Sequence, residues 1–267
     1  MPFTNQIMNN NYHTHMYLCR HADGDVKDYV EKAIELGFKS IGMSDHAPFA
    51  ELKDRSVRMH LSDLKIYIIK CDNAIEKYKN KIKVYKALEI EFFPQHKKIY
   101  PEYLKYMDYL ALGQHYIFDA ESKNNLRSAY ALSTLEHLES YVDTVVEAMS
   151  TGYFKFVCHP DLMLYNIKHF NCDITRISKK LIQGAIDSNV PLEINSNGIR
   201  KGLKETEDGL RYIYPRKEFW QLVKKMGARV IISSDAHQVD QLFDEDVIKA
   251  YQFANDLDIV VEEELMF

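Results

Sequence analysis

Short runs of apolar residues, several of them alternating with polar ones, recur along the whole chain and predict strands. Side chains alternate between the two faces of a strand, so alternation indicates a half-buried strand and an unbroken apolar run a fully buried one. The segments with these patterns are also short enough to be strands. They are residues 11–18, 39–46, 83–93, 108–117, 154–161, 191–197 and 229–237.

Apolar residues at intervals of three and four predict helices between most of these strands. Within residues 25–38, for example, Val26, Tyr29, Val30 and Ala33 fall on one side of a helix. A single apolar side is the pattern of a helix that packs on a protein core. The same spacing occurs in residues 61–80, 133–152, 173–188 and 215–227.

Strands that alternate with helices imply a parallel sheet covered by the helices. The chain has 267 residues and no linker rich in glycine, serine or proline, so we expect one domain spanning residues 1–267. The predicted fold is α/β, a distorted (β/α)7 TIM-like barrel. The active site of such a barrel lies at the C-terminal ends of its strands. The acidic tail, residues 258–267, is expected to add a short strand or an end cap.

The overall composition narrows the possible partners. A net charge of -5 gives no basic field that would attract long nucleic acids or an acidic membrane surface. A small phosphate compound bound through metal ions remains compatible with this charge. The four cysteines have no C-x-x-C spacing, which favours a reducing, cytoplasmic location. The segment MPFTNQIMNNN lacks the features of a signal peptide, and no apolar run approaches membrane-spanning length.

Candidate metal ligands gather at the ends of the predicted strands. The first strand contains an H-x-H pair, His13 and His15, and the last ends in a D-x-H pair, Asp235 and His237. Residues i and i+2 share a strand face, so each pair can direct two donors toward one point. Imidazole and carboxylate groups bind zinc, iron and manganese. A multinuclear metal site is expected, because the other strand ends contribute Asp45, His46, Glu89, Glu91, His115, His159 and Glu193.

The order of these motifs resembles the PHP (polymerase and histidinol phosphatase) family. The motifs are H-x-H, S-D-H, E-x-E, H, H-P-D, E-x-N and S-D-A-H, and they extend over almost the whole chain. The resemblance implies a barrel that holds three divalent ions, either Zn, Mn or Fe. It also implies that Glu91 bridges two of them. The implied ligands are His13, His15, Glu91 and Asp235 for the first ion, Glu91, His115 and His159 for the second, and His21, His46 and His237 for the third.

Ions of this kind lower the pKa of bound water and offset the charge of phosphoryl oxygens. The resemblance therefore implies a phosphomonoesterase that works by hydroxide attack, with Glu91, Asp235 and His46 as catalytic residues. Asp45 is a further candidate, as a proton donor to the leaving group or in a supporting role. The leading substrate is L-histidinol phosphate, an intermediate of histidine biosynthesis. The alternatives are nucleotides or oligonucleotide ends, a C–N hydrolase of the amidohydrolase type, and a metal-binding scaffold without catalysis.

Basic side chains after the strands are candidates for binding the phosphate, because a guanidinium matches phosphate oxygens. Arg200 and Lys201 follow the sixth strand. Arg55 and Arg58 follow the second, in a loop long enough to act as a lid. Asn195, on the sixth strand, is expected either to bond the substrate or to orient ligands.

Two further observations concern how the ligands are supported and which substrate is used. Glu89 shares its strand face with Glu91 and is expected to lie deeper and orient ligands. Glu193 has the same possible roles as Asn195.

Some histidinol phosphatases have an arginine soon after the histidine of the fifth strand, whereas this chain has Tyr165 in that neighbourhood. The sequence therefore defines the chemistry more firmly than the substrate.

Overall fold

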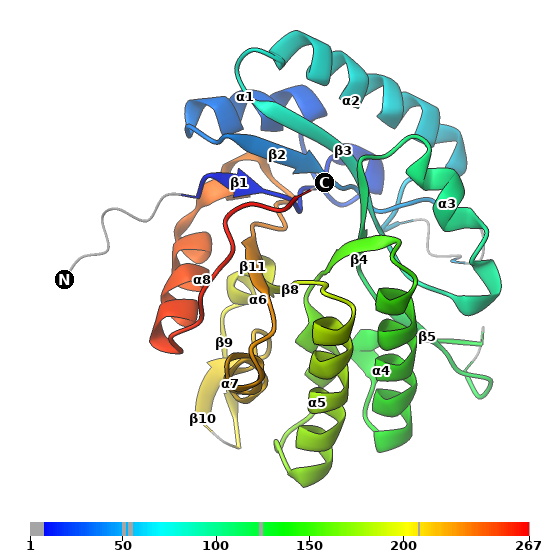
Figure 1. The fold of residues 1–267 in the computed structure, drawn as a ribbon, viewed down its shortest axis with the longest axis vertical. Coiled ribbons are helices and arrows are strands. Elements are labelled where there is room, and N and C mark those ends of the chain that lie inside the picture. Colours follow the sequence, from blue (N-terminus) through cyan, green and yellow to red (C-terminus); the bar gives the residue numbers. More distant parts are fainter. Residues whose placement is uncertain (1–7, 50–51, 53–55, 123–124, 208, 267) are drawn as a thin grey trace.

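Seven parallel strands form a nearly closed barrel in the computed structural model, which describes residues 8–49, 52, 56–122, 125–207 and 209–266. Each strand pairs in parallel with its neighbour, in the order β1–β2–β3–β4–β7–β8–β11. The predicted (β/α)7 barrel is therefore confirmed (Figure 1). Its strands are β1 (Asn10–Asn11), β2 (Ser40–Met43), β3 (Lys83–Ile90), β4 (Tyr109–Leu112), β7 (Phe154–Val157), β8 (Leu192–Asn195) and β11 (Val230–Ser233).

Contacts between the first and the last strand close the barrel. Thr14 and Ala236, just beyond β1 and β11, form a parallel bridge. The backbone N–H of His15 donates to the carbonyl of Ala236 at 2.9 Å. The side-chain oxygen of Asn11 accepts from the backbone N–H of Ser234 at 2.8 Å. The H-x-H and D-x-H motifs, near opposite ends of the sequence, consequently lie side by side.

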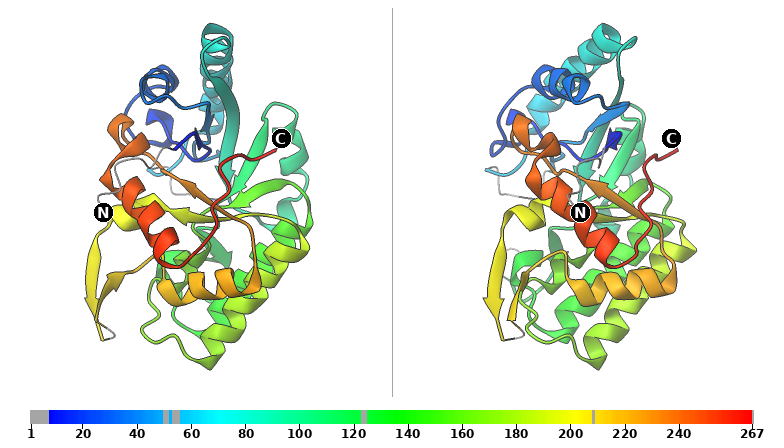
Figure 2. Two further views of the ribbon diagram at one scale, coloured as in Figure 1. Left: turned by 60° about the vertical axis from the view of Figure 1, so that its left-hand side comes forward. Right: turned by 90° about the vertical axis from the view of Figure 1, so that its left-hand side faces the viewer.

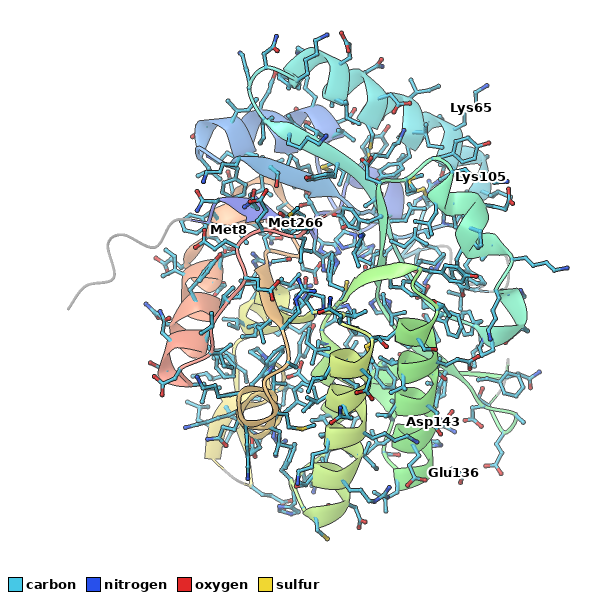
Figure 3. All side chains as sticks on the ribbon, in the orientation of Figure 1. Met8, Lys65, Lys105, Glu136, Asp143 and Met266 are labelled. Carbon is cyan, nitrogen blue, oxygen red and sulfur yellow. The ribbon has the colours of Figure 1, made fainter. Side chains whose placement is uncertain are left out.

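Helices cover the outside of the barrel and pack their apolar sides against it (Figures 1 and 2). Asp25 caps the first of them, and Tyr29 on its inner side is fully buried. Charged side chains such as Lys65, Glu136 and Asp143 point outward into solvent (Figure 3). The helices are α1 (Val26–Glu35), α2 (Leu64–Tyr78), α3 (Ile99–Leu104), α4 (Leu135–Ser150), α5 (Cys172–Asp187), α6 (Ser196–Arg200), α7 (Lys217–Met226) and α8 (Glu245–Asp256).

The C-terminal tail covers the end of the barrel at which the strands begin. The backbone N–H of Glu262 donates to the carbonyl of Val230, the first residue of β11, at 2.7 Å. The backbone N–H of Leu265 donates to the Tyr12 hydroxyl at 3.1 Å, and the Leu265 side chain is buried beside Phe156 in the barrel interior. Residues 257–266 form no strand, so the tail is an end cap.

Two antiparallel hairpins follow barrel strands at the opposite end. β5 (Tyr116–Phe118) and β6 (Leu126–Ser128) follow β4, and the short 3-10 helix η4 (Ala129–Ala131) comes next. β9 (Leu203–Thr206) and β10 (Gly209–Tyr212) follow β8 and extend from the edge of the barrel (Figure 2). These insertions surround the C-terminal ends of the strands. Across the described ranges, no helix combines the length and apolar character needed to cross a membrane.

Candidate metal centre

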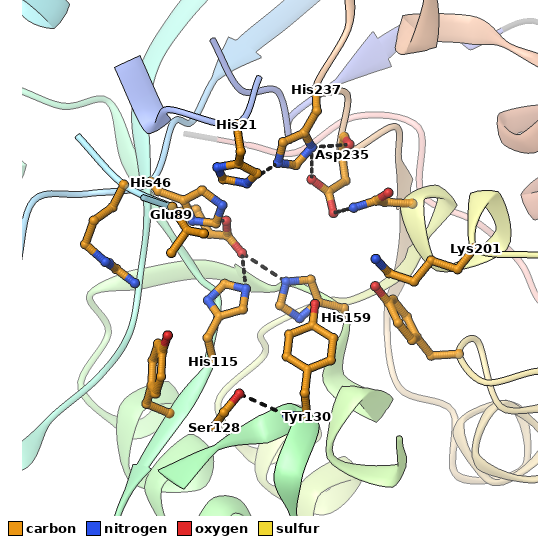
Figure 4. A pocket seen from close by; sticks show the side chains of 15 residues that line it. His21, His46, Glu89, His115, Ser128, Tyr130, His159, Lys201, Asp235 and His237 are labelled. Atoms are coloured by element: carbon orange, nitrogen blue, oxygen red, sulfur yellow. Dashed lines mark hydrogen bonds and ion pairs between the residues drawn. The ribbon is translucent and has the colours of Figure 1, made fainter. Parts of the chain in front are cut away.

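A cavity of about 480 Å³ opens at the C-terminal ends of the barrel strands (Figure 4). Its inner wall contains imidazoles and carboxylates from the predicted ligand motifs. Its outer wall contains Tyr116, Tyr130, Tyr214 and Lys201. The three tyrosines come from the two hairpins and the segments after them. The cavity therefore combines a cluster of metal-binding groups with a rim of phenols and a cation.

Glu89, on β3, lies at the centre of the imidazole cluster. Its Oε2 atom is 2.9 Å from Nδ1 of His46. The same oxygen lies 3.4 Å from Nε2 of His13 and 3.5 Å from Nε2 of His15. One carboxylate oxygen thus faces imidazoles from the ends of two neighbouring strands.

The second oxygen of Glu89 faces a different pair of imidazoles. Its Oε1 atom is 3.0 Å from Nε2 of His159 and 3.6 Å from Nε2 of His115. The Glu89 side chain is only 1% exposed, so both oxygens are shielded from bulk water. A carboxylate placed between two groups of histidines has the geometry of a bridge between two cations.

Asp235, just after β11, forms a second focus of the cluster. Its Oδ1 atom lies 3.0 Å from Nε2 of His15, 3.4 Å from Nδ1 of His237 and 3.6 Å from Nε2 of His13. Nε2 of His237 in turn faces Nε2 of His21 at 2.9 Å (Figure 4). These side chains come from the first and last strand ends, as the H-x-H and D-x-H motifs predict.

The arrangement of donor atoms fits divalent cations. Nε2 of His13 and Nε2 of His15 face one another at 3.1 Å, and at most one of them can carry the proton between them. Glu89 Oε2 and Asp235 Oδ1 are buried and have no hydrogen-bond partner. Ligand atoms of His13, His15 and Asp235 lie within 4.8 Å of one another. These nitrogen and oxygen atoms converge without enough protons to hydrogen-bond one another. They are the types of ligand that bind zinc, manganese or iron.

Three of the imidazoles are held from behind by a buried carboxylate. In each pair Nδ1 donates to the carboxylate, which leaves Nε2 free to face the centre of the cluster. Such pairs fix the ring orientation and raise the basicity of a metal-binding histidine. The pairs are His13 with Glu193 at 2.8 Å, His15 with Asp45 at 3.3 Å, and His115 with Glu91 at 3.1 Å.

The structure does not favour Glu91 as the bridging ligand. Glu91 accepts two hydrogen bonds from the Arg58 guanidinium, at 2.9 Å and 3.1 Å, in addition to the one from His115. Both of its oxygens are therefore engaged behind the cluster rather than within it. Glu89, which we expected only to orient ligands, has the central position instead. The other predicted ligands all lie in the cluster, and metal binding by them stays a prediction.

The structure also gives Asp45 and Asn195 supporting positions. Asp45 is fully buried behind His15 and does not reach the cavity, so it is not placed to protonate a leaving group. The Asn195 amide donates to Asp235 Oδ2 at 3.1 Å and to Glu193 at 2.8 Å. Asn195 is 1% exposed. It therefore holds these carboxylates from a buried position, and contact with a substrate stays a prediction.

The basic residues differ in their access to the cavity. The Arg200 guanidinium is bound by Asp244, at 2.7 Å from Nε, and by backbone carbonyls, so its nitrogens are engaged away from the cavity and its phosphate contact stays a prediction. Lys201, the next residue, lines the cavity. Arg58 also lines it, but its forked nitrogens are used by Glu91. Arg55 lies outside the described residues.

The electrostatics of the cluster keep its carboxylates ionised. Burial alone would raise the pKa of the Glu89 carboxyl, but His46 and His13 hold it well below its usual range. Burial would likewise raise the pKa of Asp235, and His13 and His15 lower it well below its usual range. Burial lowers the pKa of His46 well below the usual value. Burial would also lower the pKa of His13 and of His15, but neighbouring acidic side chains raise both well above the usual value. Metal ions require neutral imidazoles, so their binding would displace protons from these two rings.

Two residues of the cluster also have unusual backbone conformations. His159 and Asp235 have φ angles of 33° and 44°. Such left-handed conformations cost a non-glycine residue on the order of 1–3 kcal/mol and concentrate at functional sites. Here they turn the chain sharply after β7 and β11, so that both side chains enter the cavity.

A Gly113→Ala substitution should weaken metal binding, because the Glu89 carboxylate occupies the space where a side chain at position 113 would lie. A Cβ atom at position 113 would lie 2.0 Å from Oε1 of Glu89, so the carboxylate would have to move. We expect at least about a tenfold loss of metal affinity, the scale seen when ligand-orienting contacts are lost. Titration calorimetry with zinc would measure the loss. Gly184→Ala, a crowded glycine on α5 far from Glu89 in the sequence, is the control. Unchanged zinc affinity in Gly113→Ala would contradict the central position of Glu89.

Comparison with known proteins places this site in a family. Residues 11–197 match the PHP domain. The chain is 25% identical to the histidinol-phosphatase of Bacillus subtilis, over 85% of this chain and 92% of that protein. It is also 25% identical to a probable histidinol-phosphatase of Deinococcus radiodurans, over 85% of each chain.

Solved structures agree with the fold. Histidinol phosphate phosphatase from Lactococcus lactis, complexed with zinc, L-histidinol and phosphate, is similar with a TM-score of 0.71 and 16% sequence identity. The match covers 98% of this chain and 100% of that one. Because the PHP domain match covers residues 11–197, well over half of the chain, this chain belongs to the PHP family.

Proposed function

We propose that this chain is a metal-dependent phosphomonoesterase with three divalent ions at the centre of the cluster. The observation that carries the proposal is the position of Glu89 between two groups of histidines, with Asp235 as a second focus. His13, His15, His21, His46, His115, His159 and His237 would complete the ligand set. Ions held there would lower the pKa of a water molecule and offset the negative charge of the phosphoryl oxygens.

The protein's own residues would position the phosphate ester. Lys201 projects into the cavity from the side opposite His46 (Figure 4) and places an ammonium group within it. An ammonium is a suitable partner for a phosphate oxygen. The Asn197 amide donates to Asp235 Oδ2 at 3.3 Å and holds that carboxylate from the same side. Buried walls on the barrel side would exclude bulk water from the reacting group.

We propose L-histidinol phosphate as the substrate, with L-histidinol and phosphate as products, a reaction of histidine biosynthesis. The support comes from the histidinol-phosphatase relatives and from the L-histidinol and phosphate bound in the Lactococcus lactis protein. The cavity of about 480 Å³ suits a small ester. Tyr165, in the neighbourhood where some histidinol phosphatases have an arginine, packs edge-on against Tyr130.

Phosphate release from L-histidinol phosphate tests the proposal. The metal-loaded protein would be compared on L-histidinol phosphate, AMP and 4-nitrophenyl phosphate, with chelator-treated protein as the blank. We expect kcat/KM for L-histidinol phosphate to exceed the others by at least about tenfold, since discrimination is set by differential contacts in the transition state. Similar slow hydrolysis of all three would keep the phosphomonoesterase and reject this substrate. The absence of metal-dependent release from any of them would reject both.

A further inference from the structure

Tyr130 enters the cavity from η4, on the side opposite His21 and His237, with its hydroxyl end directed inward (Figure 4). Its ring is 40% exposed at the rim and packs edge-on against Tyr165, with ring centroids 5.1 Å apart. The backbone carbonyl of Tyr130 accepts from the Asn166 amide at 2.6 Å. The phenol is therefore held in place on its outer side while its hydroxyl faces the metal centre.

A second phenol, Tyr214, lines the same cavity. Tyr214 is 1% exposed and fixed in the wall. Within the described ranges, no hydrogen bond is formed in which the Tyr130 hydroxyl donates to a protein group. Its proton is therefore available for an acceptor inside the cavity.

Other acids near the cavity are less well placed to protonate a leaving group. Asp45 is fully buried behind His15. The imidazoles of the inner wall face one another and the two carboxylates, as ligands do. Lys201 lines the rim, where an ammonium can offset phosphate charge. Tyr130 thus combines an inward hydroxyl with a free proton.

We propose that the Tyr130 hydroxyl donates its proton to the leaving oxygen of the phosphate ester, a step that rests on the proposed function. Water adds its oxygen to phosphorus, and the ester P–O bond breaks with its electron pair on the leaving oxygen. That oxygen takes the proton of Tyr130 Oη and departs as the alcohol. Water then returns a proton to Tyr130, while the protons of the attacking water pass to phosphate and solvent. The balance is one ester and one water giving one alcohol and one phosphate.

The acidity of Tyr130 suits this step. Burial raises the pKa of Tyr130 to about 12. The phenol therefore keeps its proton at neutral pH. It remains a stronger acid than an aliphatic alcohol, so transfer to an alkoxide is downhill. A weakly basic leaving group, such as 4-nitrophenolate, departs without such a proton donor.

The test compares wild type and Tyr130→Phe on a series of esters whose leaving groups become steadily more basic. The series would run from 4-nitrophenyl phosphate through phenyl phosphate to an alkyl phosphate, with the enzyme loaded with its metal ions. We expect Tyr130→Phe to lose on the order of 10²-fold in kcat for the alkyl ester and little for the 4-nitrophenyl ester, as general acid catalysis requires. The inhibition constant of inorganic phosphate should not change, because the ring and the metal centre are retained.

Matched variants separate this role from a structural one. Tyr165→Phe removes the hydroxyl of the ring that packs on Tyr130 outside the cavity, and it should leave the dependence on leaving group as in wild type. Tyr214→Phe should give a smaller loss than Tyr130→Phe, again confined to basic leaving groups. An equal loss on all esters, or no loss, would overturn the proposal. Turnover of the 4-nitrophenyl ester by wild type requires the proposed function but not proton donation by Tyr130. A failure of the proposed function can therefore be told apart from a failure of the Tyr130 proposal.

Discussion

Replacing Glu89 by Gln should abolish most phosphate release and most metal binding while leaving the barrel folded. The two oxygens of Glu89 face different groups of histidines, at 2.9 Å from His46 and 3.0 Å from His159. An amide would keep the shape but replace one anionic oxygen with an NH2 group directed at an imidazole or a cation. We expect kcat/KM to fall by at least about 10³-fold, beyond the 10–100-fold typical of residues that only orient ligands. Phosphate release and bound metal per chain would be measured together.

Glu91→Gln provides the matched control for that experiment, because it makes the same change two residues further along the chain. Glu91 holds His115 and Arg58 and does not face the cavity. Its substitution should cost roughly 10–100-fold in activity and retain most of the metal. If Glu91→Gln lost the metal and Glu89→Gln kept it, the bridging position would belong to Glu91, as the sequence resemblance implies.

The exchange of these two glutamates shows how far sequence reasoning reaches. The E-x-E motif predicts that both side chains lie on one strand face, but β3 ends at Ile90, between the two glutamates. Which of them reaches the centre depends on contacts from elsewhere in the chain. Arg58 follows a different strand and binds Glu91, and Gly113 at the end of β4 leaves room for Glu89. Spacing along one strand contains no information about either contact.

Arg200 shows the same limit for the rim of the site. Its place after the sixth strand correctly predicts a position near the C-terminal ends of the strands. The short helix α6 then turns successive residues by about 100°. Arg200 consequently faces Asp244 at the cap of α8, and Lys201 faces the cavity. The sequence identifies the pair but not which member points inward.

The sequence predicts those helices that are long enough for their apolar residues to show a helical period. The segments expected to be helical contain α1, α2, α4, α7 and all of α5 except its first residue. α3 and α6 have only six and five residues, too few to display a helical period. α8 was missed although it buries residues at helical spacing, among them Val247, Ala250 and Ala254. The hairpins and the segments after them supply the phenols of the cavity wall, and nothing in their own sequence predicts that they lie over the site.

Removing Arg58 should destabilise the fold more than any other single change at the site. The Arg58 and Glu91 side chains are 4% and 1% exposed and form two hydrogen bonds. Arg58→Met would leave a buried carboxylate without its cation, which typically costs about 3–5 kcal/mol. Denaturant unfolding in the presence of a chelator would measure the loss without a contribution from metal release. The double variant Arg58→Met, Glu91→Met should lose less than Arg58→Met alone, because no unpaired charge remains.

The acidity of Glu91 gives an independent check of the same pair. Burial would raise the pKa of its carboxyl, but Arg58 and His115 lower it from 4.5 to about 2. A carboxyl whose pKa is depressed by folding stabilises the protein above its unfolded pKa, and this contribution disappears as the pH falls through the folded value. The stability that Glu91 contributes should thus be complete at neutral pH and decline from about pH 4.5 toward pH 2, by about 3 kcal/mol in all. The double variant should lack this part of the acid sensitivity. Equal pH dependence in wild type and double variant would mean that Arg58 does not hold Glu91 ionised.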